Sequence, residues 1–194
     1  MTYELIVIGA SWGGLHAVGE ILSALPRDLE AAVVVAQHRR IDTAELAALL
    51  GGRAHLPVGD VDDKQPIERG HVYLAPPDYH LLIERGYFAL SQDERVHYSR
   101  PSIDVLFESA ADAYRERVIG VILTGSNEDG AAGLARVKAR GGVAVVQDPE
   151  TAERGEMPGA ALARTEADAV LPLGEIGPFL YGLVVKPAPR TEPA

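Results

Sequence analysis

Short runs of apolar residues alternate with helical patterns along most of the chain. Five unbroken runs of valine, isoleucine, leucine and alanine predict strands at 5–8, 31–36, 72–75, 118–124 and 143–147. Runs without polar alternation are typical of strands that are covered on both faces of a parallel sheet. Strands that alternate with helices indicate repeated β-α units.

Apolar residues at helical spacing predict helices between and after these strands. The predicted helices lie at 15–25, 46–50, 103–114, 134–138 and 176–183. Glycine pairs at 51–52 and 141–142 mark the C-terminal ends of two of them. These elements together predict an α/β fold with a central, mainly parallel sheet and helices on both faces.

One segment departs from this alternation. Residues 80–83 and 87–90 are apolar and flank Glu84-Arg85-Gly86, which predicts an antiparallel hairpin. We expect it at the edge of the sheet, so the predicted fold class is a three-layer, doubly wound α/β fold with an antiparallel edge hairpin. One domain is expected over residues 1–185, followed by a disordered, proline-containing tail at 186–194.

Composition narrows the classes of function. The 194 residues contain no cysteine, which excludes disulfides and thiolate nucleophiles. The net charge of −10 argues against nucleic-acid binding, which needs clustered lysine and arginine. No apolar stretch approaches the roughly 20 residues that span a bilayer, and no signal peptide is evident. We therefore expect a cytoplasmic protein that does not insert into membranes.

The end of the first strand carries the clearest chemical signal. The run at 5–8 leads into Gly9-Ala10-Ser11-Trp12-Gly13-Gly14, and a helical pattern follows at once. Ser11 thus has glycine two positions away on either side, which is the spacing of a nucleophile elbow. The helix N-terminus that follows can stabilise developing negative charge. Ser11 is therefore the predicted nucleophile of a serine hydrolase.

Polar residues at other strand ends complete a candidate triad. Ligands of open α/β sheets bind at the carboxyl ends of the strands. His38 follows the second strand, and Asp129 follows the strand at 118–124. Acyl transfer needs such a hydroxyl, imidazole and carboxylate. Asp129 can also cap the helix that follows it, and Asp78 and Asp148 are rival carboxylates. The order Ser, His, Asp differs from that of α/β-hydrolases, which makes that fold unlikely here.

The same residues belong to a longer pattern along the chain. It comprises Ile8-Gly9-Ala10-Ser11, Gly13-Gly14, Gln37-His38, Gly70-His71-Val72-Tyr73-Leu74-Ala75-Pro76, Arg100-Pro101-Ser102-Ile103-Asp104-Val105-Leu106-Phe107, Leu123-Thr124-Gly125, Asp129-Gly130-Ala131 and Met157-Pro158. Over about residues 4–183, this pattern resembles the catalytic domain of the chemotaxis protein-glutamate methylesterase family, CheB. The resemblance implies a modified doubly wound sheet and hydrolysis of γ-glutamyl methyl esters on chemoreceptor helices. It also implies deamidation of certain receptor glutamines, with Ser11, His38 and Asp129 as the triad.

Two positions near the predicted site depart from the family pattern. Trp12 stands where the family usually has threonine, and Gly125-Ser126-Asn127 replaces a Gly-Met-Gly turn. We expect Trp12 and Ser126 to line the substrate site, with backbone N–H groups there forming the oxyanion hole. Only residues 1–3 precede the first strand, so we expect any receiver domain that controls access to be a separate protein.

No cofactor or metal is expected. The six histidines show no metal-ligand spacing, although His80 is a candidate for the cleft. Two rival functions remain. A dinucleotide-binding domain would need an acidic residue at the end of the second strand, where Gln37-His38 stands. A non-catalytic CheB-like module that docks on receptors or signalling proteins is the other rival, and fluorophosphonate labelling of Ser11 would distinguish it.

Overall fold

A seven-stranded parallel sheet forms the centre of the protein in the computed structural model, which describes residues 3–38 and 43–185. The strand order is β3-β4-β2-β1-β7-β8-β9, and every neighbouring pair is parallel. The strands are β1 (Leu5–Ala10), β2 (Ala32–Gln37), β3 (Val58–Asp60), β4 (Val72–Leu74), β7 (Val118–Ile122), β8 (Val143–Gln147) and β9 (Ala169–Leu171).

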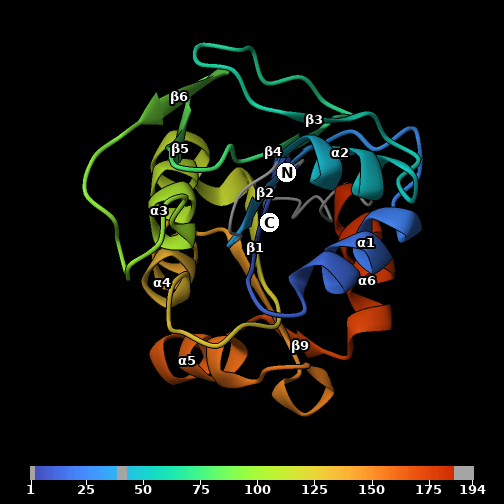
Figure 1. The fold of residues 1–194 in the computed structure, drawn as a ribbon. Helices are drawn as coiled ribbons and strands as arrows, with labels where there is room; N and C mark the ends of the chain where they lie inside the picture. Colours follow the sequence, from blue (N-terminus) through green and yellow to red (C-terminus); the bar gives the residue numbers. More distant parts are fainter. Residues whose placement is uncertain (1–2, 39–42, 186–194) are drawn as a thin grey trace, which may run out of the picture.

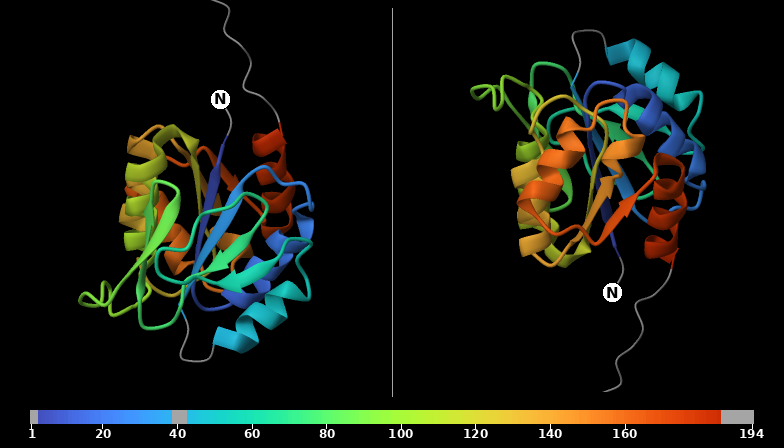
Figure 2. Two further views of the ribbon diagram at one scale, coloured as in Figure 1. Left: turned by 90° about the horizontal axis from the view of Figure 1, so that it is seen from above. Right: turned by 90° about the horizontal axis from the view of Figure 1, so that it is seen from below.

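Helices cover both faces of this sheet and make three layers (Figure 1). They are α1 (Gly14–Ala24), α2 (Thr43–Gly51), α3 (Ile103–Tyr114), α4 (Ala131–Ala139), α5 (Glu156–Arg164) and α6 (Leu173–Val185), with short 3-10 helices at Arg115–Arg117 and Pro149–Thr151. α1, α2 and α6 lie on one face, and α3, α4 and α5 lie on the other, as both views in Figure 2 agree. Each face therefore has its own apolar core.

The predicted fold class is confirmed. All five predicted strands form, each with ends within two residues of the expected ones, and the five predicted helices also form. The two short strands β3 and β9 and the helix α5 were not predicted. Two of these are the edge strands of the sheet, where a segment of three residues gives little hydrophobic signal.

The predicted hairpin forms, but it does not lie at the edge of the large sheet. β5 (His80–Glu84) and β6 (Tyr87–Ser91) make a separate two-stranded antiparallel sheet. Its apolar side packs in the same core as α3, through Leu81 and Phe88. The Ile83 N–H also donates to the Ser109 hydroxyl at 3.0 Å. Contact with α3 explains why the hairpin leaves both sheet edges to β3 and β9.

The order of the strands fixes where a ligand site can form. Along the chain, β2, β3 and β4 are added on one side of β1. After the hairpin and α3, the strands β7, β8 and β9 are added on the other side. β1 thus lies at the point where the order of winding reverses, and ligands of such sheets bind at the carboxyl ends of the strands there. Ser11, His38 and Asp129 follow β1, β2 and β7, the three central strands.

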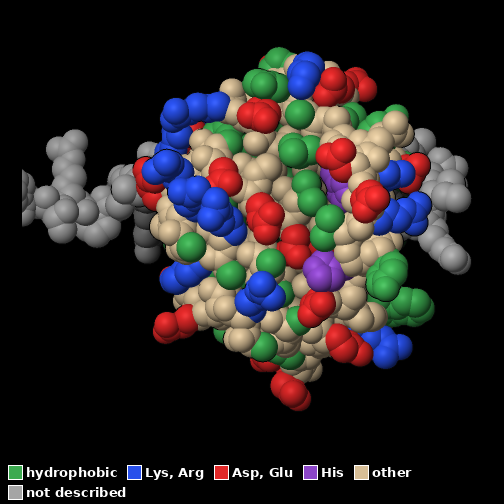
Figure 3. Space-filling view, turned by 90° about the vertical axis from the view of Figure 1, so that its left-hand side faces the viewer, with side chains coloured by type: hydrophobic (Ala, Val, Ile, Leu, Met, Phe, Trp, Pro, Cys, Tyr) green, Lys and Arg blue, Asp and Glu red, His purple; other side chains and the backbone are tan. Residues whose placement is uncertain are grey.

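The outer surface over α3, α4 and α5 is strongly polar, with acidic and basic side chains intermixed (Figure 3). Asp112 of α3 accepts hydrogen bonds there from Arg136 at 3.1 Å and from Arg140 at 2.8 Å. These groups are well exposed, so such pairs contribute little to stability.

None of the helices in the described part of the chain combines the length and the apolar character of a membrane span. The tail predicted at 186–194 lies outside the described residues. The domain boundary at residue 185 therefore stays a prediction.

Candidate active site

Ser11 sits in a tight turn between β1 and α1. Its N–H donates to the Thr124 carbonyl at 2.9 Å, and its own carbonyl accepts from the Gly14 N–H at 2.9 Å. Gly13 has a φ of 78°, in the left-handed region that favours glycine. A Cβ at Gly14 would lie only 2.1 Å from the Gln37 side chain. The turn therefore needs both glycines, as the elbow spacing predicts.

His38 lies beside Ser11, one strand across. The last paired residues of β1 and β2 are Ala10 and Gln37, and the His38 N–H donates to the Ala10 carbonyl at 3.0 Å. The Gln37 side chain then donates to the carbonyls of Ser11 at 2.7 Å and His38 at 3.1 Å. Parallel strands lie about 4.8 Å apart, so the two backbone segments leave the sheet side by side.

Asp129 is fully buried and accepts four hydrogen bonds. Its Oδ2 accepts from His38 Nε2 at 2.7 Å and from the Ile103 N–H at 2.8 Å. Its Oδ1 accepts from the Ser102 hydroxyl at 2.8 Å and from the Asp104 N–H at 3.0 Å. The second and third predicted site residues are thus in direct contact.

The surroundings of Asp129 favour its charged form. Burial alone would raise the pKa of this carboxyl, but the hydrogen bond from His38 and the backbone N–H groups of Asp104 and Ile103 outweigh burial, so the pKa is lowered. Because a carboxylate only accepts, Nε2 of His38 carries the proton in this pair. The lone pair of the neutral imidazole is then on Nδ1, which makes Nδ1 the basic nitrogen.

In the part of the chain that the structure describes, the basic nitrogen has only a long contact with another side chain. Nδ1 of His38 lies 3.5 Å from the Ser99 hydroxyl. Within the described residues, no hydrogen bond joins the Ser11 hydroxyl to the imidazole. Catalytic hydrogen bonds are often long or misaligned without substrate and tighten in the complex.

Asp129 does cap a helix, but a different one from the helix expected. It receives the first two N–H groups of α3, whereas the N-cap of α4 is Gly130 and gives no side-chain cap. Asp104, in the first turn of α3, returns the contact by accepting from the N–H groups of Gly130 at 3.0 Å and Gly133 at 2.6 Å. We call this pair of contacts the reciprocal cap. It joins the starts of α3 and α4, two neighbours far apart in sequence.

The reciprocal cap predicts how Asp104 affects stability. Burial is the largest cause that raises the pKa of Asp104, followed among the raising causes by the Asp129 charge, and the backbone N–H groups only partly offset them. Because the Asp104 carboxyl has a higher pKa in the folded protein than in the unfolded chain, its protonation stabilises the fold at pH values below the unfolded-state pKa of about 3.9. This contribution is lost as the pH rises through the pKa of the folded state. Asp104→Asn keeps the acceptor and removes the charge, so its stability relative to wild type should increase from about pH 4 to pH 7.

Urea unfolding of wild type and Asp104→Asn at these two pH values measures the effect. Asp104→Ala is the matched control, because it leaves two buried N–H groups without an acceptor and should cost about 1–3 kcal/mol at both pH values. A relative stability of Asp104→Asn that does not change with pH would show that the charge on Asp104 is not unfavourable in the fold.

The rival carboxylates and His80 have structural roles. Asp148 caps the short helix Pro149–Thr151 by accepting from the Glu150 N–H at 3.0 Å. Asp78 is exposed and pairs with Arg100 at 2.8 Å. His80 is buried, with Nε2 at 2.9 Å from the Glu94 carbonyl and Nδ1 accepting from the Ser102 N–H at 3.2 Å. His80 thus helps to position the segment that leads into α3.

One group of the described residues offers metal-ligand atoms, namely His97, Asp104 and Asp129, whose atoms lie within 4.8 Å of one another. Both oxygens of Asp129 already accept two hydrogen bonds each. That leaves His97 and the Oδ2 atom of Asp104, which are 3.3 Å apart. Two protein ligands fall short of the three or four typical of protein-bound zinc, so we assign no metal to this group.

The expected oxyanion donors lie on two sides of Ser11. The N–H of Gly125 is used, since it donates to the Arg154 carbonyl at 3.0 Å. The N–H groups of Trp12 and Ser126 donate to no other residue in the described part of the chain. Trp12 and Ser126 therefore stay the candidate donors, and the oxyanion hole stays a prediction.

Trp12 is held in a defined position although its side chain is 60% exposed. Its indole N–H donates to Glu153 at 2.7 Å, and the Arg154 guanidinium lies over its ring, 5.7 Å from the centroid. The Thr124 hydroxyl donates to the Trp12 carbonyl at 2.9 Å and accepts from the Arg154 N–H at 2.9 Å. The segment before α5 thus supports the nucleophile turn, a role that the sequence did not reveal.

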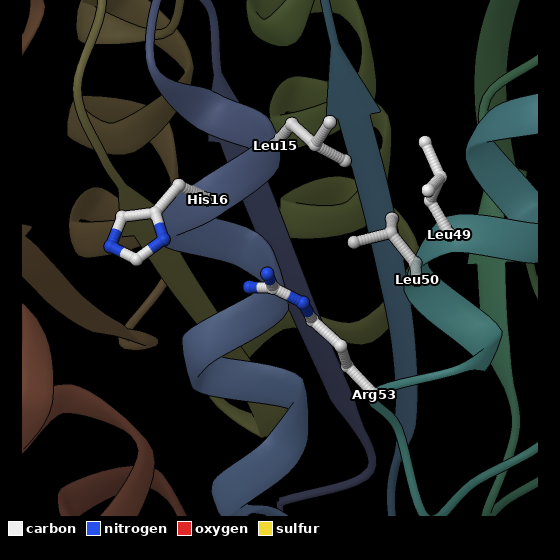
Figure 4. A pocket seen from close by; sticks show the side chains of 5 residues that line it. All are labelled: Leu15, His16, Leu49, Leu50 and Arg53. Atoms are coloured by element: carbon white, nitrogen blue, oxygen red, sulfur yellow. The ribbon is translucent and has the colours of Figure 1, made fainter.

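A pocket of about 160 Å³ opens next to this turn, between α1 and α2 (Figure 4). It is lined by Leu15, His16, Leu49, Leu50 and Arg53. The leucines face one another across the gap, and the Arg53 guanidinium reaches across toward α1. His16 is 70% exposed, as expected of a surface residue. The pocket holds no member of the candidate triad.

Comparisons with known proteins agree with this geometry. The family model described as CheB methylesterase matches residues 6–180. A protein of Leptospira interrogans is 49% identical over 186 residues, which are 94% of this chain and 96% of that protein, and its name provisionally gives protein-glutamate methylesterase/protein-glutamine glutaminase. A protein of the same name from Hydrogenovibrio crunogenus is 37% identical over 190 residues, which cover 95% of this chain and half of that protein.

A solved structure gives the same result for the fold. The crystal structure of the Thermotoga maritima CheB methylesterase catalytic domain matches with a TM-score of 0.91 at 34% identity. The match covers 95% of this chain and all of that domain. This chain is therefore similar to the catalytic domain along nearly its whole length.

Proposed function

Since this chain belongs to the CheB methylesterase family, we propose that it hydrolyses γ-glutamyl methyl esters on chemoreceptor helices, with Ser11, His38 and Asp129 as its catalytic triad. One observation carries the assignment of the triad. The 2.7 Å hydrogen bond between His38 and buried Asp129 lies next to Ser11, at the carboxyl ends of the three central strands.

In the proposed first step, the Ser11 hydroxyl attacks the ester carbonyl while Nδ1 of His38 takes its proton. Asp129 stabilises the imidazolium that forms, because its carboxylate stays charged in the fold. The oxyanion of the tetrahedral intermediate is received by the Trp12 and Ser126 N–H groups. The intermediate then collapses, the C–O bond to the methoxy group breaks, and His38 protonates the leaving methanol.

Water completes the cycle. It attacks the glutamyl-serine ester while His38 takes a proton from it, and the Ser11 hydroxyl is regenerated as glutamate leaves. The same steps would release ammonia from a glutamine side chain, the second activity in the names of the relatives. No cofactor takes part in this scheme.

Methanol release tests the proposal. Purified protein is added to membranes that hold chemoreceptors carrying labelled methyl esters, and the volatile label is counted. We expect label to be released as methanol by the wild type and release to be abolished by prior treatment with a fluorophosphonate. Full release after complete labelling of Ser11, or no release by folded wild-type protein, would contradict the proposal.

The non-catalytic docking module is the second candidate, because Trp12 and Ser126 replace residues usual in the family pattern. The same fluorophosphonate separates the two functions, since an unactivated serine does not react with it. The sequence adds two parts to the proposed esterase function. We propose that a separate receiver or signalling protein regulates the enzyme and that the enzyme is located in the cytoplasm.

A further inference from the structure

Three exposed apolar side chains lie on α1, on α2 and in the turn that precedes α1. Trp12 is 60% exposed, Leu15 is 44% exposed and Leu49 is 56% exposed. We call these three side chains the α1–α2 strip. Leu15 and Leu49 line the pocket between the two helices (Figure 4), and Trp12 follows Ser11 directly. Exposed apolar groups that adjoin a site indicate a surface that a partner covers.

The strip is continuous with the nucleophile turn. His16 lines the pocket between α1 and α2, and it also lines a second pocket that reaches Gly13 and Glu153. Glu153 is the carboxylate that holds the Trp12 indole. A partner that lies along the strip therefore passes close to Ser11.

Two arginines flank the strip. Arg53 lines the pocket at one end, and Arg154 lies over the Trp12 ring at the other. Both are exposed, and neither has an ion pair with any residue in the part of the chain that the structure describes. Some other arginines are paired with acidic groups, for example Arg100 and Arg117. Arg27, which lies away from the strip, resembles Arg53 and Arg154 in having no ion pair with the described residues, so the position of the two arginines beside the strip is what sets them apart. In a chain of net charge −10, two unpaired cations beside one apolar strip favour an acidic partner.

We propose that the α1–α2 strip binds an amphipathic, acidic helix that carries the esterified glutamate. The apolar side chains of that helix cover Trp12, Leu15 and Leu49, and its carboxylates face Arg53 and Arg154. Side chains three and four positions apart share one helix face, so one face can present the ester together with its apolar and acidic neighbours. This inference rests on the proposed function and adds how its substrate is recognised.

Trp12 provides a direct test of binding, because it is the only tryptophan in the chain. A helical peptide with one glutamyl methyl ester, leucines on the same face and flanking glutamates is titrated into Ser11→Ala protein, which leaves the ester intact. We expect a saturable change in tryptophan fluorescence. Leu49→Glu should weaken the Kd about tenfold, the size of effect typical of a residue central to an interface.

Matched controls separate this surface from general effects of charge and exposure. Val170 on β9 is 45% exposed at the far edge of the sheet, so Val170→Glu should leave the Kd unchanged. Arg53→Gln and Arg154→Gln should each weaken it about fivefold at low salt and less at high salt, whereas exposed Arg27→Gln should not. An unchanged fluorescence signal at saturating peptide, or equal effects of Leu49→Glu and Val170→Glu, would overturn the proposal.

Kinetics distinguish failure of this inference from failure of the proposed function. In protein that retains Ser11, Leu49→Glu should lower kcat/KM for the helical ester about tenfold. It should leave kcat/KM unchanged for a small ester, the γ-methyl ester of N-acetylglutamate. Equal loss on both esters would refute docking at the strip while the esterase activity stands. If the wild type cleaves neither ester, the proposed function fails, and the fluorescence titration still decides whether the helix binds.

Discussion

Replacing Ser11 with alanine should lower the rate of methanol release about 10⁶-fold, the loss typical of removing a serine nucleophile. Without the hydroxyl no acyl-enzyme can form, and only transition-state binding by the remaining groups is left. The Ser11 backbone keeps its hydrogen bonds to Thr124 and Gly14 in the variant, so folding should be unaffected. Turnover of receptor methyl esters and the unfolding midpoint together measure both parts of this expectation.

Ser99 is the matched control for this experiment. Its hydroxyl is 3.5 Å from Nδ1 of His38, so by distance alone it is a rival nucleophile. Ser99→Ala should lower turnover less than tenfold, because removing one orienting contact of a held imidazole is a small loss. A loss below tenfold for Ser11→Ala, or a loss for Ser99→Ala as large as that expected for Ser11→Ala, would remove Ser11 as the nucleophile.

Asp129→Asn should lower turnover about 10⁴-fold through the wrong imidazole tautomer. When the amide is turned so that its NH₂ takes the position of Oδ2, this group faces Nε2 of His38 and can only donate to it. The imidazole must then carry its proton on Nδ1, where it cannot accept the proton of Ser11. The loss is measured as the ratio of kcat/KM between wild type and variant, determined over a range of pH. Asp148→Asn is the control, because Asp148 caps only a short helix, and its variant should keep activity within a few fold.

The same Asp129→Asn variant should also destabilise the fold. The two oxygens of Asp129 each accept one backbone N–H of α3, from Ile103 and from Asp104. Whichever way the amide of the introduced asparagine is turned, its NH₂ group faces one of these N–H groups, which is then buried without an acceptor. The expected cost is about 1–3 kcal/mol in urea unfolding. Full stability together with full loss of activity would show that the cap is dispensable.

Much of the fold was predictable because its strands are long and covered on both faces. β1, β2 and β7 are continuous apolar runs, and burial on both faces is what such runs indicate. The helix α5 was missed because Pro158 and Gly159 stand in its first turn and few apolar residues follow at helical spacing. The hairpin was placed at the wrong location because its partner, α3, is fixed by tertiary packing that local pattern does not encode.

The candidate site was predictable to the extent that strand ends determine it. Ser11, His38 and Asp129 follow adjacent parallel strands, so the carboxyl-end rule alone brings them to one edge. The surroundings of Asp129 were not predictable, since its donors come from α3, about 25 residues earlier in the chain. For the same reason the contacts of Asp104 with Gly130 and of Glu153 with Trp12 gave no sequence signal.

The reciprocal cap has a consequence for how this protein can evolve. A lineage that abandons ester hydrolysis can lose the hydroxyl at position 11 by neutral drift, because no described neighbour depends on that hydroxyl. Position 129 has no such freedom, since selection for a folded chain alone retains an aspartate there. A degenerate descendant should therefore keep this aspartate long after its serine has gone, and the presence of the aspartate alone is no sign of an active enzyme.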